Sequence, residues 1–220
     1  MKSAVIRYVI AIATVISAPA FALQTADRPP AALSQMRDAA IAVYDSARVS
    51  DWPATSERLH TLDAAAATLP SPPGKADLTQ QLRGRMQALK DAIRDQQSAD
   101  AATNANWVAR LADELSDAYE IRVPIDVRLL AFYGRAIQID AIRQRPQQEK
   151  VDMADLRTVW SRVEPMVLQR NGVDVARRFT DRLAQLDGAV QKGDAANAAA
   201  LLVASSDDVI ALFASRRPAA

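Results

Sequence analysis

Apolar side chains recur at alternating spacings of three and four residues along most of the chain. This is the period of a helix that buries one face, and the strict alternation of a half-buried strand is hard to find. The pattern predicts an all-α fold of about eight antiparallel helices, arranged as four helical hairpins in one domain over residues 30–215. The first apolar seam is Leu33, Met36, Ala40, Val43 and Ala47, and the sixth is Ala176, Phe179, Leu183, Leu186 and Val190.

These two seams match position by position at a constant offset, which also pairs Asp51 with Asp194. Such self-similarity indicates a repeated hairpin, although any two amphipathic hairpins can align this well. A repeated unit and a chance match are therefore both left open. The pattern fits a helical bundle and also a short solenoid.

The most apolar stretch lies near the middle of the chain, at residues 125–142. Only a thin polar stripe interrupts it, through Arg128, Arg135 and Gln138. A helix that is apolar on nearly every side needs several neighbours to cover it. These residues are therefore predicted to form the central helix of the domain.

Several helix ends can be placed from single residues. Asp51 is a typical N-cap, and Pro53 follows it where a missing N–H costs nothing. Gly172 and Gly193 fit the position after a helix C-terminus. Pro165 falls inside a good seam, which predicts a kink or a restarted helix near Glu164.

The N-terminus has the pattern of an export signal. Residues 1–22 contain two basic residues, an apolar run over residues 8–16 and a small-residue cleavage pattern that ends at Ala22. The apolar run is shorter than the roughly 20 residues that cross a bilayer, so no membrane anchor is expected after cleavage. We therefore expect a periplasmic or secreted protein with a flexible segment at 23–29 and a disordered tail at 216–220.

Composition excludes several classes of function. The chain has 27 basic residues, two of them in the predicted signal, against 26 acidic residues, so nucleic acid is not an expected partner. The absence of cysteine excludes disulfides and thiolate metal or haem motifs. No nucleophile elbow, phosphate-binding glycine loop or helical zinc-protease motif is present. The sequence therefore predicts a protein that is not an enzyme and carries no cofactor.

The single histidine, His60, lies in an E-x-x-H pattern with Glu57. Asp63 is one helical turn further on, so the three side chains form one strip that could hold a divalent ion weakly. A second histidine-bearing motif, which a di-iron bundle requires, is absent. The favoured interpretation is a solvated helix face rather than a metal site.

A second candidate site lies around the central hairpin. Tyr133 and Asp140 are two turns apart on a mostly apolar helix, where a carboxylate needs a partner such as Arg110 or Arg143. The favoured interpretation is a buried ion pair that fixes helix register, and the alternative is the polar floor of a small ligand pocket. The candidate ligand-binding residues are Trp107, Tyr119, Tyr133, Arg135 and Asp140.

Together these patterns favour an exported, non-enzymatic helical bundle that serves as a periplasmic accessory or adaptor and binds a protein partner. The alternative is a sensor or carrier that binds a small ligand or a metal ion. An exposed apolar patch of more than a few hundred Å² would favour the first hypothesis. A polar-floored cavity beside Tyr133 and Asp140 would favour the second.

Overall fold

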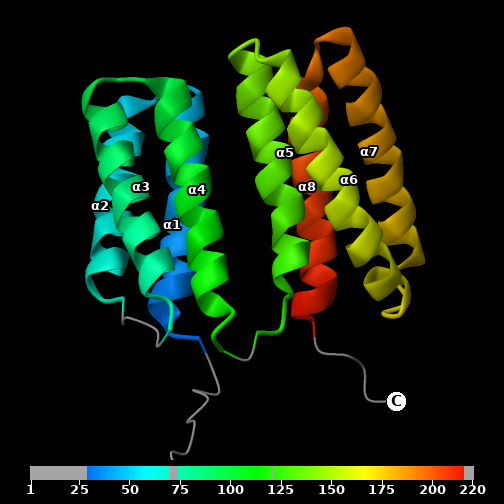
Figure 1. The fold of residues 1–220 in the computed structure, drawn as a ribbon, viewed down its shortest axis with the longest axis horizontal. Helices are drawn as coiled ribbons and strands as arrows, with labels where there is room; N and C mark the ends of the chain where they lie inside the picture. Colours follow the sequence, from blue (N-terminus) through cyan, green and yellow to red (C-terminus); the bar gives the residue numbers. More distant parts are fainter. Residues whose placement is uncertain (1–28, 70–73, 120, 216–220) are drawn as a thin grey trace, which may run out of the picture.

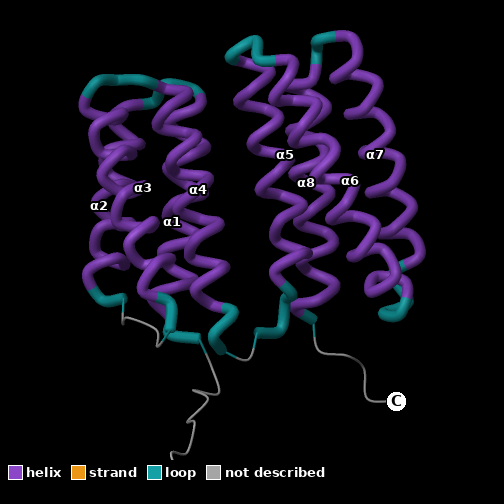
Figure 2. Tube along the Cα trace, viewed as in Figure 1, coloured by secondary structure: helices purple, strands orange, loops and turns teal. Residues whose placement is uncertain are grey.

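The computed structural model describes residues 29–69, 74–119 and 121–215. Within them the chain forms eight helices and no strand (Figure 2), which confirms the predicted all-α fold. The predicted signal at 1–22, the tail at 216–220 and all of segment 23–29 except its last residue lie outside this part. The helices are α1 (Ala31–Arg48), α2 (Trp52–Ala67), α3 (Ala76–Arg94), α4 (Ser98–Ser116), α5 (Ile125–Ile142), α6 (Pro146–Leu168), α7 (Val173–Lys192) and α8 (Ala195–Ala214).

The helices form two groups of four that stand side by side (Figure 1). We call α1 to α4 the first unit and α5 to α8 the second unit. In each unit the first and fourth helices make the most extensive contact, and α4 against α5 is the main contact between units. This arrangement makes α1 correspond to α5, whereas the sequence offset pairs α1 with α7. Repetition of the hairpins therefore stays a prediction.

Each unit buries its own hydrophobic cluster. The first cluster contains Met36, Leu62 and Leu111, and one residue of α5, Ile139, joins it. The second contains Leu130, Ile137, Met153, Phe179 and Leu202 among others. All five residues of the first predicted seam are buried, as the helical period requires: Leu33, Met36, Ala40, Val43 and Ala47.

Five of the turns between helices share one backbone geometry. In the turn from α1 to α2, the N–H of Ser50 donates to the carbonyl of Ala47 (2.9 Å), and that of Asp51 donates to Ser46 (3.0 Å). This is a Schellman motif, which satisfies the last carbonyls of a helix and needs one left-handed residue. The left-handed residues are Ser50, Gln96, Gln144, Asn171 and Gly193.

The predicted caps are right at two positions and wrong at one. The Asp51 carboxylate accepts a hydrogen bond from the N–H of Ala54 (3.2 Å), and Gly193 is left-handed at the end of α7. Gly172 is not left-handed, because Asn171 takes that position. Glycine is needed at 172 for another reason: a Cβ there would lie 2.5 Å from Cδ2 of Leu212.

Pro165 does not restart α6. The helix continues through it to Leu168, so that part of the prediction is wrong. Pro165 lies in the last turn, where the loss of one N–H leaves only the carbonyl of Ser161 without a helical partner. Ser161 is exposed, so water can reach this carbonyl.

The polar stripe of α5 is largely buried between the units. The Tyr44 hydroxyl of α1 donates to Oε1 of Gln138 (2.7 Å). Nε of Arg135 donates to Oδ1 of Asn106 on α4 (2.8 Å), and Nδ2 of Asn106 donates to the carbonyl of Phe132 (3.0 Å). Burial lowers the pKa of Arg135. The stripe is therefore the polar centre of the α1–α4–α5 interface and not a solvated face.

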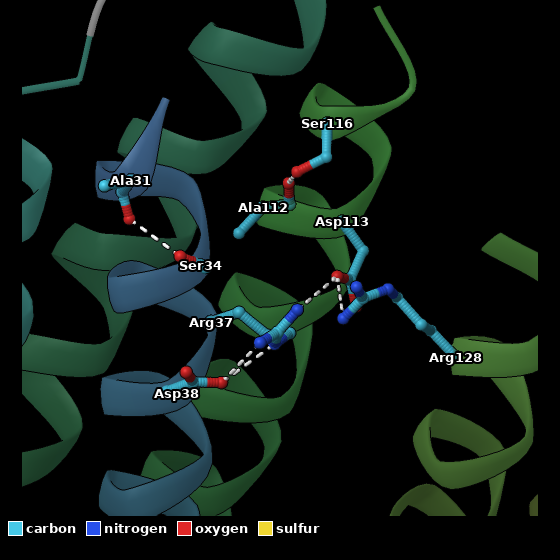
Figure 3. Close-up of polar contacts among 8 residues, drawn as sticks. All are labelled: Ala31, Ser34, Arg37, Asp38, Ala112, Asp113, Ser116 and Arg128. Carbon is cyan, nitrogen blue, oxygen red and sulfur yellow. Dashed lines mark hydrogen bonds and ion pairs between the residues drawn. The ribbon is translucent and has the colours of Figure 1, made fainter. Parts of the chain in front are cut away.

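A cluster of ion pairs joins the same three helices (Figure 3). Asp113 on α4 lies 3.2 Å from Arg128 of α5 and 3.7 Å from Arg37 of α1, and Arg37 also contacts Asp38 at 2.7 Å. Burial raises the pKa of Asp113 to about 6, although both arginines oppose this. The two units are therefore held together by hydrogen bonds and charges as well as by apolar contact.

Among the helices of the described residues, α8 alone is long and apolar enough to cross a membrane by length and composition, with a mean hydropathy of 1.4. Here α8 packs against α5 and α7, and Leu202 and Val209 are fully buried in the second cluster. Asp207 and Asp208 are exposed near its middle. These features are those of a helix that packs into a protein core.

Candidate ligand-binding cleft

A cleft of about 380 Å³ opens over α5, between α4 on one side and the N-terminal half of α6 on the other. It brings together three of the five predicted ligand residues, Trp107, Tyr133 and Asp140. The other two lie elsewhere. Arg135 is in the interface between the units, and Tyr119 follows the end of α4 and packs on the first hydrophobic cluster.

The side of the cleft next to α4 is aromatic. The rings of Trp107 and Phe132 meet edge to face with centroids 5.2 Å apart, and Phe132 meets Tyr133 at the same distance. The Arg110 guanidinium lies 4.7 Å from the Trp107 centroid, and that of Arg85 lies 4.8 Å from it. These contacts hold a large, partly exposed apolar surface in a fixed position.

The opposite side of the cleft is acidic. The carboxyl groups of Asp140 on α5 and Asp152 on α6 lie within hydrogen-bonding reach of each other. Burial raises the pKa of Asp152 to about 6, and the charges of Asp140 and Asp155 act in the same direction. The Gln148 amide donates to Oδ1 of Asp152 (3.0 Å), which opposes this shift only in part.

Two neighbouring groups extend the acidic side. Glu149 is only 3% exposed, and its Oε2 has no hydrogen-bond partner among the described residues. Burial raises its pKa, as does the charge of Asp140. Burial also raises the pKa of Tyr133, whose hydroxyl faces the Asp155 carboxylate. Repulsion between carboxylates in a partly buried cleft favours the protonated carboxyl groups or the binding of a cation.

The predicted ion pair at Asp140 is not formed. Arg110 pairs with Glu114 at 2.7 Å, and Arg143 pairs with Asp100. No ion pair among the described residues includes Asp140; its carboxyl lies within hydrogen-bonding reach of Asp152, and the charges of Arg145 and Arg143 act on it from beyond ion-pair distance. The register of α5 against α6 puts Asp152 where a basic residue was expected. This leaves the pocket interpretation as the better account of Tyr133 and Asp140.

The predicted metal strip on α2 lies at the surface. Glu57 and His60 are exposed, and Asp63 pairs with Lys90 of α3 at 2.8 Å. Over residues 29–69, 74–119 and 121–215, no group of three or more metal-binding side chains is arranged to hold an ion. The strip therefore has the geometry of a solvated helix face.

A second hollow, of about 500 Å³, lies between α2 and α3. These two helices make few contacts with each other. The buried floor of this groove is apolar, and charged and polar side chains form its edge. The floor includes Met36, Leu82 and Met86, and the edge includes Asp63, Arg83, Gln87 and Lys90.

Fold and cleft together define an all-α protein of two four-helix units. An aromatic and acidic cleft lies over α5, the helix of the second unit that packs against α4 of the first. Comparison with family models, with curated proteins and with solved structures finds no match to this chain. Function therefore has to be inferred from the geometry of the cleft.

Proposed function

We propose that this protein binds a small organic ligand in the α4–α5–α6 cleft and serves as a sensor or carrier without catalysing a reaction. One observation carries the proposal: three helices bring an aromatic surface and several carboxyl groups that form no ion pair to one partly enclosed cleft. Clefts that bind small ligands have this composition, with apolar walls and a few polar groups that converge.

The energetics of the acidic side support a binding role. A carboxyl group whose pKa is raised on folding destabilises the native state at neutral pH, by about 1.4 kcal/mol for each unit. Asp140, Glu149 and Asp152 all have raised pKa values within one short region. A loss of stability concentrated in one small region is typical of ligand-binding and catalytic sites, and networks of charged groups with a purely structural role also produce it. With the export signal that the sequence predicts, the cleft would work in the periplasm.

A thermal-shift screen tests this function. Small cations, neutral molecules and anions are added separately, and unfolding is followed by circular dichroism. A true ligand at 100 times its Kd adds about 2.7 kcal/mol, which raises the Tm by about 5–10 °C for a chain of this size. The shift should disappear in Trp107→Leu and persist in Trp52→Leu, the same change on α2 outside the cleft. If no compound stabilises the protein, or the shift survives Trp107→Leu, the cleft is not the ligand site.

A second candidate function retains the protein partner that the sequence suggested. The specific observation is the α2–α3 groove, whose apolar floor suits the apolar face of a partner's amphipathic helix. Along α3 the groove extends from Thr79 to Lys90, a length of roughly 16 Å or three helical turns. Methionines on its floor can adjust to a partner's side chains.

Site-specific photo-crosslinking in the periplasm tests this second candidate. A photoreactive residue replaces exposed Gln87 at the edge of the groove, and the control replaces exposed Gln191 on α7. We expect one discrete adduct at position 87, with the cross-link mapped to an amphipathic helix of the captured protein. Equal labelling at both positions would contradict a role for the groove.

A further inference from the structure

We infer that the ligand is a small organic cation, an amine whose ammonium group binds among Asp140, Asp152 and Asp155 while its apolar part packs on Trp107 and Tyr133. This inference rests on the proposed function and specifies its ligand. The balance of charge in the cleft is the first step. Its lining contains three carboxyl groups from these aspartates and two guanidinium groups, from Arg110 and Arg145.

The two arginines offset this negative charge only in part. Arg110 is paired with Glu114 and lies over the rings of Trp107 and Phe132, on the aromatic side. Arg145 lies in the exposed turn between α5 and α6 and forms no ion pair with Asp140; its charge and that of Arg143 lower the pKa of Asp140, but burial raises it by more. Buried Glu149 adds a further carboxyl group beside Asp140. An anionic ligand would therefore meet repulsion on the acidic side, whereas a cation would relieve it.

An ammonium group fits the acceptors better than a neutral donor does. It offers three N–H donors and a full charge, and charge-assisted hydrogen bonds are roughly twice as strong as neutral ones. The Asp140 and Asp152 pair supplies adjacent acceptor oxygens. A bare metal ion is a poorer fit, because the carboxyl groups of the described residues form no group of three with metal-binding geometry.

The aromatic side selects the rest of the ligand. The guanidinium groups of Arg110 and Arg85 lie 4.7 and 4.8 Å from the centroid of the Trp107 ring, and these cation–π contacts fix the position of the ring. Beside it, Phe132 and Tyr133 form an apolar surface that suits a ring or a short alkyl chain. A cleft of about 380 Å³ holds a molecule with one aromatic ring and a short amine side chain.

Proton linkage follows from the same geometry. Below about pH 6 the Asp152 carboxyl is protonated, so an ammonium group must displace that proton to bind. The affinity for an amine should therefore fall by up to about tenfold for each pH unit below this value. The ionisable groups around Asp152 are Tyr133 and Asp140 on α5, Arg143 and Arg145 in the turn after it, Glu149 and Asp155 on α6, and Arg110 on α4.

Three probes that share a phenyl ring and differ in charge test the inference: phenethylamine, 2-phenylethanol and 3-phenylpropionate. Isothermal titration calorimetry near pH 7.5 measures each against the full mature chain. We expect the amine to bind at least about tenfold more tightly than the alcohol, and the carboxylate not to bind. Asp152→Asn should weaken amine binding about tenfold or more, whereas Asp181→Asn, the same change at an exposed site on α7, should not.

The outcomes separate the inference from the proposed function. The alcohol or the carboxylate could instead bind as tightly as the amine or more tightly, with binding lost in Trp107→Leu. That result would refute the inference that the ligand is a cation, but it would support the cleft as the ligand site. Amine binding that is unchanged in Asp152→Asn would overturn the assigned carboxyl group. If neither these probes nor any compound of the thermal-shift screen binds, both the inference and the proposed function fail. Circular dichroism of Asp152→Asn checks that any loss of binding is not a loss of fold.

Discussion

Replacing Asp152 with asparagine isolates the energetic cost of the acidic side of the cleft. The residue is 9% exposed, and burial together with Asp140 raises its pKa from 3.8 to about 6. Asparagine has nearly the same shape, and its side-chain oxygen can still accept the hydrogen bond from Gln148. The change therefore removes the charge with little effect on packing.

The pKa shift gives the size and the sign of the effect. A rise from 3.8 to about 6 corresponds to roughly 3 kcal/mol as an upper bound, and screening by solvent reduces this to about 1–2 kcal/mol. The folded pKa is above the unfolded one, so the penalty is complete above about pH 6. It is lost as the pH falls toward 3.8, because the folded state takes up the proton first.

Urea denaturation followed by circular dichroism, at several pH values between about 4 and 7.5, measures this difference. Asp152→Asn should be about 1–2 kcal/mol more stable than wild type at the upper end and equal to it near pH 4. Asp181→Asn, the same change at an exposed site on α7, should stay within about 0.5 kcal/mol of wild type throughout. A less stable Asp152→Asn variant at neutral pH, or a difference that does not change with pH, would refute the reasoning.

Two further predictions concern packing and the interface. Gly172→Ala should lower the stability by about 1–3 kcal/mol because its Cβ would meet Leu212, whereas Gly84→Ala on α3, with open space around it, should gain about 0.5–1 kcal/mol. Thermal melts of both variants check this, and a stable Gly172→Ala protein would contradict the close approach. Tyr44→Phe should cost about 1–3 kcal/mol by leaving the amide oxygen of Gln138 without its donor. Urea denaturation measures this loss, and a neutral change would mean that the hydrogen bond adds nothing.

The helices could be predicted because each carries its period in its own sequence. The burial of the Leu33 to Ala47 seam and the caps at Asp51 and Gly193 follow from local chemistry. Two of the other left-handed turn residues, Ser50 and Gln96, carry no strong local signal. Their conformation is set by the motif that ends the helix, which any small or flexible polar residue tolerates at some cost.

Helical geometry also explains which of the candidate residues line the cleft. Seven residues separate Tyr133 from Asp140, so about two turns bring them to the same face of α5. Arg135 follows Tyr133 by two residues, which turns it roughly 200° away and into the interface. Asp152 could not be found this way, because its contact with Asp140 depends on how α6 packs against α5. An acid next to the core residue Met153 was the one local signal.

The cleft depends on the contact between the two units. Its aromatic side joins Trp107 of α4, in the first unit, to Phe132 and Tyr133 of α5, and its acidic side comes from α5 and α6 of the second unit. Asn106 belongs both to the cleft and to the interface between the units. It lines the cleft, and it also forms hydrogen bonds with Arg135 and with the carbonyl of Phe132. Buried hydrogen bonds of this kind allow one relative position of two helices and disfavour neighbouring ones. The polar residues at the centre of the interface therefore do more than join two bundles: they fix the position of Trp107 relative to the acidic side, the distance that the proposed ligand would bridge.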